Sequence, residues 1–127
     1  MSKKIIFSEN APAPVGPYSQ AVEVNGTIYL SGQIPLDPKT GELVLDSIEA
    51  QTQRVMENLK AVLLAADLSM DHVIKCNIFL TDMENFGPVN SVYETYFRSQ
   101  PPARACVQVS ALPKGVDIEI EAIAARA

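Results

Sequence analysis

An arginine in the segment PPARACVQV, residues 101–109, has the clearest potential for chemistry in this sequence. If the segment is a strand, alternation places Arg104 on one face with Cys106 and Gln108, opposite the small apolar side chains that suit a core. A guanidinium presents a planar fork of N–H donors that fits a carboxylate through two hydrogen bonds. Arg104 is therefore either a binding group for a small anion or half of a structural ion pair.

Glu119, in the segment IEIEAIA, is the second candidate and, with Glu121, a possible ion-pair partner for the arginine. In a hairpin closed by ALPKGV, Glu119 lies opposite Gln108, four residues from Arg104, or roughly 13 Å at 3.3 Å per residue. This gap is too long for a direct pair and leaves space for a small molecule, which another subunit could complete. Glu119 would then orient or deprotonate a water; the alternative is a solvated carboxylate.

Three further positions have both a functional and a structural interpretation. Tyr18 follows Gly16-Pro17 and either donates a hydrogen bond at a pocket rim or packs. The pair Ser31-Gly32 inside a strand indicates either a ligand at the backbone or a bulge, because glycine weakens strands. Cys106 is either a nucleophile beside the arginine or a small buried thiol.

Several common kinds of catalytic site are missing from the sequence. His72 is the one histidine, so a Ser/His or Cys/His nucleophilic pair is not expected. No spacing of Cys, His and carboxylate residues suits a metal, and no glycine-rich phosphate or dinucleotide motif is present. We therefore expect chemistry without a metal or a cofactor, carried out by Arg, Glu, Tyr, Ser, backbone groups and water.

The elements that position these residues follow an α+β order. Strands are predicted at 21–24 and 27–33, joined across Asn25-Gly26, and later at 73–80, 103–110 and 117–125. A long amphipathic helix is predicted from Asp46, with Glu49 completing a capping box, to Ala66. A second helix follows Thr81-Asp82, and Gly87-Pro88 is expected to break its first turn. The order β-β-α-β-α-β-β predicts one sheet with two helices on one face.

Two helices leave the second face of this sheet without cover. That face is either solvated, as is common for antiparallel sheets, or buried against copies of itself. Its residues mix polar with semi-apolar types, which favours a homo-oligomer with pockets where subunits meet. The predicted members of this face are Tyr29, Ser31, Gln33, Lys75, Asn77, Arg104, Cys106, Gln108, Glu119 and Glu121.

Length and composition limit the class of protein. The 127 residues are predicted to form a single domain, and 47% hydrophobic content suffices for a core. A formal charge of −5 without a basic cluster argues against nucleic-acid binding. No apolar run has the length of a membrane span or signal peptide. The two cysteines, Cys76 and Cys106, form no motif and are expected to be free, which is typical of a cytoplasmic protein.

The sequence resembles the RidA family, also called YjgF/YER057c/UK114, over essentially its whole length. The matching stretches are GPYSQAV (16–22), SGQIPLDPKTGE (31–42), PPARACVQV (101–109) and IEIEAIA (118–124). The most specific feature is the spacing of Pro102-Ala103-Arg104, Leu112 and Ile118-Glu119-Ile120. One departure is the short RSQPP connection, which carries Pro101 where some members have an aromatic residue.

The resemblance implies a chorismate-mutase-like fold assembled as a homotrimer with a central barrel and sites between subunits. It implies hydrolysis of reactive 2-imino or enamine acids to 2-keto acids and ammonia, which protects other enzymes from damage. By motif position, the carboxylate-binding arginine corresponds to Arg104 and the water-orienting glutamate to Glu119. The remaining implied site residues are Tyr18, Ser31, Gly32, Cys106 through its carbonyl, and Asn90.

Two other functions remain open from the sequence. Arg104 alone would suffice for a protein that binds or senses a 2-keto acid or another small carboxylate. Family members have also been described as endoribonucleases that inhibit translation, but the acidic chain favours this less, because a ribonuclease must attract phosphates.

Overall fold

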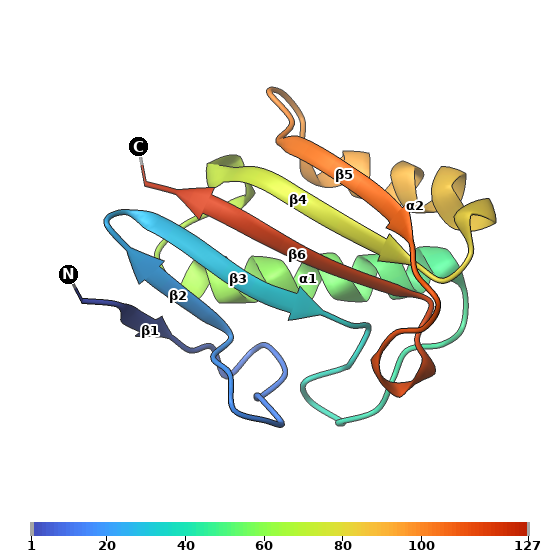
Figure 1. The fold of residues 1–127 in the computed structure, drawn as a ribbon, viewed down its shortest axis with the longest axis horizontal. Coiled ribbons are helices and arrows are strands. Elements are labelled where there is room, and N and C mark those ends of the chain that lie inside the picture. The colour runs from blue at the N-terminus through green and yellow to red at the C-terminus, as the bar shows by residue number, and fades with distance from the viewer. Residues whose placement is uncertain (1, 127) are drawn as a thin grey trace.

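The fold, obtained as a computed structural model that describes residues 2–126, is a six-stranded mixed sheet with two α-helices (Figure 1). The strand order is β1-β2-β3-β6-β4-β5, and only β4 and β5 run parallel. The predicted α+β class and the mixed sheet are confirmed, with one added strand at the N-terminal edge. The elements are β1 (Lys4–Ile6), β2 (Ala21–Val24), β3 (Thr27–Gln33), α1 (Ile48–Ala65), β4 (Val73–Leu80), α2 (Phe86–Tyr93), β5 (Ala103–Gln108) and β6 (Ile118–Ala125). Short 3-10 turns are η1 (Met70–His72), η2 (Met83–Asn85), η3 (Glu94–Tyr96) and η4 (Pro113–Gly115).

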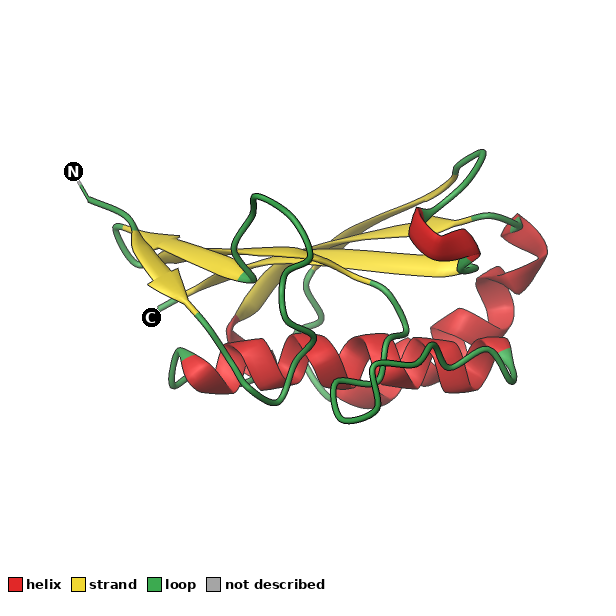
Figure 2. Cartoon of the chain, turned by 90° about the horizontal axis from the view of Figure 1, so that it is seen from below, coloured by secondary structure: helices red, strands yellow, loops and turns green. Residues whose placement is uncertain are grey.

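The helices cover one face of the sheet, as predicted, and the other face carries none (Figure 2). Ser47, rather than the predicted Asp46, caps α1, because its side chain accepts the Ala50 N–H at 3.0 Å. Helix α2 runs through Gly87-Pro88 unbroken, since proline in a first turn removes no needed N–H donor. The apolar stripe of α1 packs on the alternating apolar residues of β3, β4 and β6 to form the core: Ile28, Leu30, Val55, Met56, Leu59, Val62, Leu63, Cys76, Ile78, Leu80, Ile118, Ile120 and Ala122.

The predicted hairpin between the last two strands is wrong, because β4 lies between β5 and β6. Arg104 pairs with Cys76, and Cys106 with Ile78, in the parallel ladder of β4 and β5. Cys76 and Ile78 are buried under the helices, so Arg104 and Cys106 share the helix face. The prediction that they point away from the helices is therefore wrong. Val107 instead lies on the uncovered face, 46% exposed.

Register shifts move two more side chains from their predicted faces. A shift between Leu30 and Gln33 buries Gln33. Alternation with Cys76 and Ile78 predicts that Ile74 faces the helices, but a shift between Val73 and Lys75 leaves it half exposed. Each extra residue reverses the alternation beyond it.

No helix between residues 2 and 126 combines the length and the apolarity needed to cross a membrane.

Candidate active site

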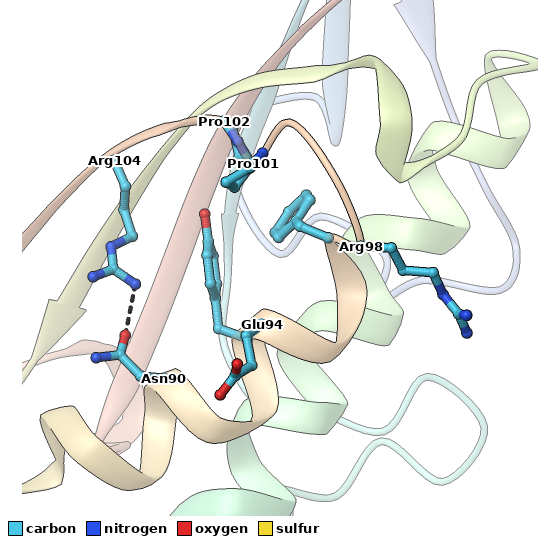
Figure 3. Close-up of a pocket in the computed structure, with 8 residues that line it drawn as sticks. Asn90, Glu94, Arg98, Pro101, Pro102 and Arg104 are labelled. Atoms are coloured by element: carbon cyan, nitrogen blue, oxygen red, sulfur yellow. Dashed lines mark hydrogen bonds between the residues drawn. The ribbon is translucent and has the colours of Figure 1, made fainter.

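Arg104 lies against one face of α2 (Figure 3). Its Nη1 donates a hydrogen bond of 2.6 Å to Asn90 Oδ1. Its Cζ lies 5.1 Å from the centre of the Tyr93 ring and 5.5 Å from that of Phe86. Rings at these distances attract a guanidinium through their negative faces. These four residues, with Cys106, are called the arginine cluster below.

The spacing of residues along α2 explains this arrangement. Phe86, Asn90 and Tyr93 stand at positions i, i+4 and i+7, which share one face of a helix. Tyr93 is only 6% exposed, so it fixes the helix against the sheet. At the other end, Gln108 of β5 accepts the Met83 N–H at 2.8 Å, which connects the arginine's strand to the turn before α2.

Arg104 has no acidic partner within the part of the chain that is described. The one ion pair among residues 2–126 joins Arg126 to Glu23, at 2.7 Å. A structural pair with Glu119 or Glu121, which the sequence left open, is thus not formed within the chain. Of the guanidinium N–H groups, only the one facing Asn90 has a partner in residues 2–126, which leaves donors for an external anion.

Both cysteines are free, and both thiols stay protonated near neutral pH. Burial raises the pKa of Cys106, and the neighbouring Arg104 only partly opposes this. Burial likewise raises the pKa of Cys76. Because the thiolate is the nucleophile, the Cys106 side chain is poorly suited to attack a substrate.

Glu119 lies on the other, uncovered face of the sheet, over the backbone of β3. A Cβ added at Gly32 would lie 2.9 Å from Glu119 Cδ and would overlap Oε2. The glycine therefore provides the space in which the carboxylate lies. Burial, and then the charge of Glu121 beside it, raise the pKa of Glu119.

Two hydroxyls, those of Tyr18 and Ser31, belong to residues around Gly32, and they differ in whether they are free to bind a ligand. Tyr18 is 50% exposed, and with Gly32 it lines a small cavity between the loop of residues 12–18 and the end of β3. Its hydroxyl accepts the Val15 N–H at 3.5 Å. The Ser31 hydroxyl donates to the Ser19 carbonyl at 2.6 Å, so its proton is already committed. Tyr18, Ser31, Gly32 and Glu119 are called the carboxylate cluster.

The predicted site residues thus form two groups that do not meet within one chain. The arginine cluster lies on the helix face of the sheet at β5, and the carboxylate cluster lies on the uncovered face at β3 and β6. Strand β4 separates the two, and the sheet itself stands between them (Figure 1). A site that uses both groups needs a second chain.

Sequence reasoning missed Phe86 and Tyr93 as neighbours of the arginine. Both belong to the second predicted helix, and aromatic residues at helical spacing usually pack in a core. Their spacing relative to Asn90 was the available signal. This spacing does not indicate contact with Arg104 when the arginine is predicted on the opposite face of the sheet.

An arginine that is oriented by a helix and has no acidic partner in residues 2–126 keeps N–H donors that could pair with an external carboxylate. Residues 8–126 match the profile of the family described as Endoribonuclease L-PSP. The chain belongs to this family, which is the RidA/YjgF family.

Relatives match over nearly their full lengths. Protein DfrA of Myxococcus xanthus is 58% identical over 126 residues, covering 98% of this chain and 96% of the relative. The 2-iminobutanoate/2-iminopropanoate deaminase of Mus musculus is 48% identical over 122 residues, covering 96% of this chain and 90% of the mouse protein. The crystal structure of TdcF from E. coli with bound serine has a TM-score of 0.94 at 44% identity, covering 98% of this chain and 99% of TdcF.

Proposed function

We propose that this protein hydrolyses reactive 2-imino acids, or their enamine tautomers, to 2-keto acids and ammonia, and so protects other enzymes from these compounds. The observation that carries the proposal is the Arg104 guanidinium, oriented by α2 and free of any acidic partner in the described chain. Mouse and rat relatives named as 2-iminobutanoate/2-iminopropanoate deaminases support it, as does TdcF with bound serine, a ligand that carries a carboxylate.

The proposed mechanism needs positioning and one proton acceptor. Arg104 binds the substrate carboxylate, with the backbone at Gly32 assisting, and the protonated imine is already electrophilic. Glu119, with the Cys106 carbonyl, holds a water and takes its proton as the oxygen adds to C2. Glu119 then gives this proton to the nitrogen, near Tyr18. The C–N bond breaks as Glu119 takes the proton of the new C2 hydroxyl, which gives ammonia and the keto acid. Burial raises the pKa of Glu119, which makes its carboxylate a stronger base than a free carboxylate.

The proposal requires an assembly in which the arginine cluster of one chain faces the carboxylate cluster of another chain. We propose a homotrimer whose uncovered sheet faces form a central barrel, with each 127-residue chain acting as one domain. The exposed side chains on that face, Tyr29 at 52% and Val107 at 46%, support burial against copies of the chain. A monomer in light scattering at assay concentration would contradict this assembly.

A coupled assay tests the proposed function. A PLP-dependent threonine or serine dehydratase releases the imino acid, and keto-acid formation is followed with and without this protein while semicarbazide competes for the imine. Acceleration is expected in proportion to the amount of protein. Absence of acceleration would overturn the proposal.

Binding of a 2-keto acid or small carboxylate without turnover is the second candidate, because Arg104 alone suffices for it. Calorimetry with 2-oxobutanoate distinguishes the two functions. Binding without imine hydrolysis would favour a sensor. The ribonuclease alternative requires RNA cleavage that is lost in Arg104→Ala, since cleavage that persists would come from another site or a contaminant.

Gly32→Ala is expected to lower kcat by about ten- to a hundredfold, because displacing a catalytic group by about 1 Å can cost this much. The new methyl group would overlap the Glu119 carboxylate and force it away from β3. Steady-state kinetics measure the change. Gly87→Ala is the matched control, because a methyl group there meets open space. Equal activity of Gly32→Ala and wild type would show that the position of Glu119 is unimportant.

Phe86→Leu is expected to raise KM about two- to fivefold with little change in kcat, because it removes one ring from the guanidinium. The side chain is 38% exposed, so the substitution should be tolerated by the fold. Phe86→Tyr retains the ring and should keep KM near the wild-type value. A similar rise in KM for both variants would argue against the ring contact.

A further inference from the structure

A cavity of about 550 Å³ lies beside Arg104, between the end of α2, η3 and the loop that leads into β5. Arg104 and Asn90 form one side of it, and Pro101 and Pro102 lie across from them (Figure 3). Tyr93 and Phe97 complete the wall. The cavity thus has a polar end at Arg104 and Asn90 and a wall of four rings, with Glu94 and Arg98 as its remaining lining residues.

The apolar wall is packed against the rest of the chain. The Tyr93 and Phe97 rings pack at 4.8 Å between centroids, with planes tilted by 50°. Tyr93 is buried and Phe97 packs against the core. Pro101 and Pro102 have restricted backbones. Little conformational freedom would be lost when a side chain binds here, which favours affinity.

The charges around the cavity indicate which side chains it suits. Arg98 also lines the cavity, but its guanidinium extends away from Arg104 (Figure 3), so the two cations do not converge on one carboxylate. Glu94 at the rim disfavours an acidic side chain, and Arg104 disfavours a basic one. An apolar side chain has no such conflict.

The volume of the cavity indicates which size of substrate side chain it suits. A 2-imino acid derived from alanine carries one methyl group at C2, which leaves most of a 550 Å³ cavity unfilled. Each additional methylene that is buried improves binding about fourfold. Longer, branched or aromatic side chains would therefore gain most.

We propose that this cavity is the side-chain subsite of the enzyme, and that it selects 2-imino acids with apolar side chains larger than methyl. The inference rests on the proposed function, because it takes Arg104 as the carboxylate-binding group. Phe97 and Pro101 are its specificity-determining residues.

A substrate series tests the preference. An L-amino-acid oxidase generates imino acids from alanine, norvaline, leucine, methionine and phenylalanine, and semicarbazide competition gives kcat/KM for each. The value for the leucine or phenylalanine imine is expected to exceed that of the alanine imine by about tenfold or more. Equal or falling values along the series would overturn the proposal.

Two variants locate the effect in the cavity. Pro101 is exposed, so Pro101→Trp should fold and fill the cavity, lowering the ratio of large- to small-substrate kcat/KM at least about tenfold. Phe97→Leu should lower the ratio less. Ser99→Trp is the matched control, because Ser99 is exposed in the same loop but does not line the cavity, and it should leave the ratio unchanged. A ratio that is the same in Pro101→Trp and wild type would place the subsite elsewhere.

Calorimetry separates failure of the subsite from failure of the proposed function. The affinities of 2-oxopropanoate, 4-methyl-2-oxopentanoate and phenylpyruvate are compared by titration. Affinity that rises with side-chain size supports the subsite even in a protein that hydrolyses no imine. Hydrolysis of every imine with affinity independent of size keeps the function and overturns the subsite.

Discussion

Replacing Arg104 with alanine is expected to lower kcat/KM for imine hydrolysis by a hundredfold or more. Two hydrogen bonds between charged groups are lost, each of about 1.5–3 kcal/mol. The side chain is exposed and makes no ion pair in residues 2–126, so the variant should fold. The coupled assay measures the loss.

Arg104→Lys provides the second comparison at this position. Lysine keeps the charge but cannot form the planar two-bond contact, so activity should remain well below wild type. Arg98→Ala controls for the removal of a positive charge close to the cavity. Activity of Arg104→Ala within about threefold of wild type would remove the carboxylate-binding role of the arginine, since a lost charged bond costs more than that.

Replacing Glu119 with glutamine is expected to lower kcat by about 10²–10⁴-fold, the usual contribution of a general base, with a smaller change in KM. Glutamine has nearly the same shape and still fits over Gly32, but it cannot accept the proton. Thermal unfolding should occur at the same or a higher temperature, because the pKa of Glu119 is raised, so its partly buried charge lowers stability at neutral pH and glutamine removes it. Unchanged kcat would exclude Glu119 as the base.

The pH dependence follows from the same carboxylate. Because the pKa of Glu119 is raised above 4.5, kcat/KM should fall as pH drops through that raised value, at which Glu119 becomes protonated. The charge of Glu121 contributes to the raised value. Glu121→Gln should therefore keep its activity while its acidic limb moves to lower pH. A limb that stays in place would assign it to another group.

The elements could be predicted from the sequence because apolar alternation and helical spacing are local patterns. Asn25-Gly26 marked a hairpin turn, and both residues have positive φ in the structure. The order of the strands could not be predicted, because pairing is decided by contacts distant in sequence. Alternation placed Arg104 on the wrong face, because the apolar Val107 was expected in the core, whereas it lies on the uncovered face.

The candidate site was predicted in its parts but not in its arrangement. Gly32 was identified as an unusual residue for a strand, and the structure gives two reasons: a register shift and the carboxylate of Glu119 lying over it. The separation of Arg104 from Glu119 was derived from a hairpin that does not form. The two residues lie on opposite faces, which only the complete sheet order reveals.

The most direct test of the proposed shared site is complementation between two inactive variants. Arg104→Ala and Glu119→Gln chains with different tags are co-expressed, and assemblies that carry both tags are isolated. In a ring of three chains containing both variants, one site in about three has the intact arginine of one chain beside the intact glutamate of the next. Imine hydrolysis near a third of the wild-type rate is predicted. Activity no higher than that of either variant alone, in assemblies shown to contain both, would contradict a site shared between chains.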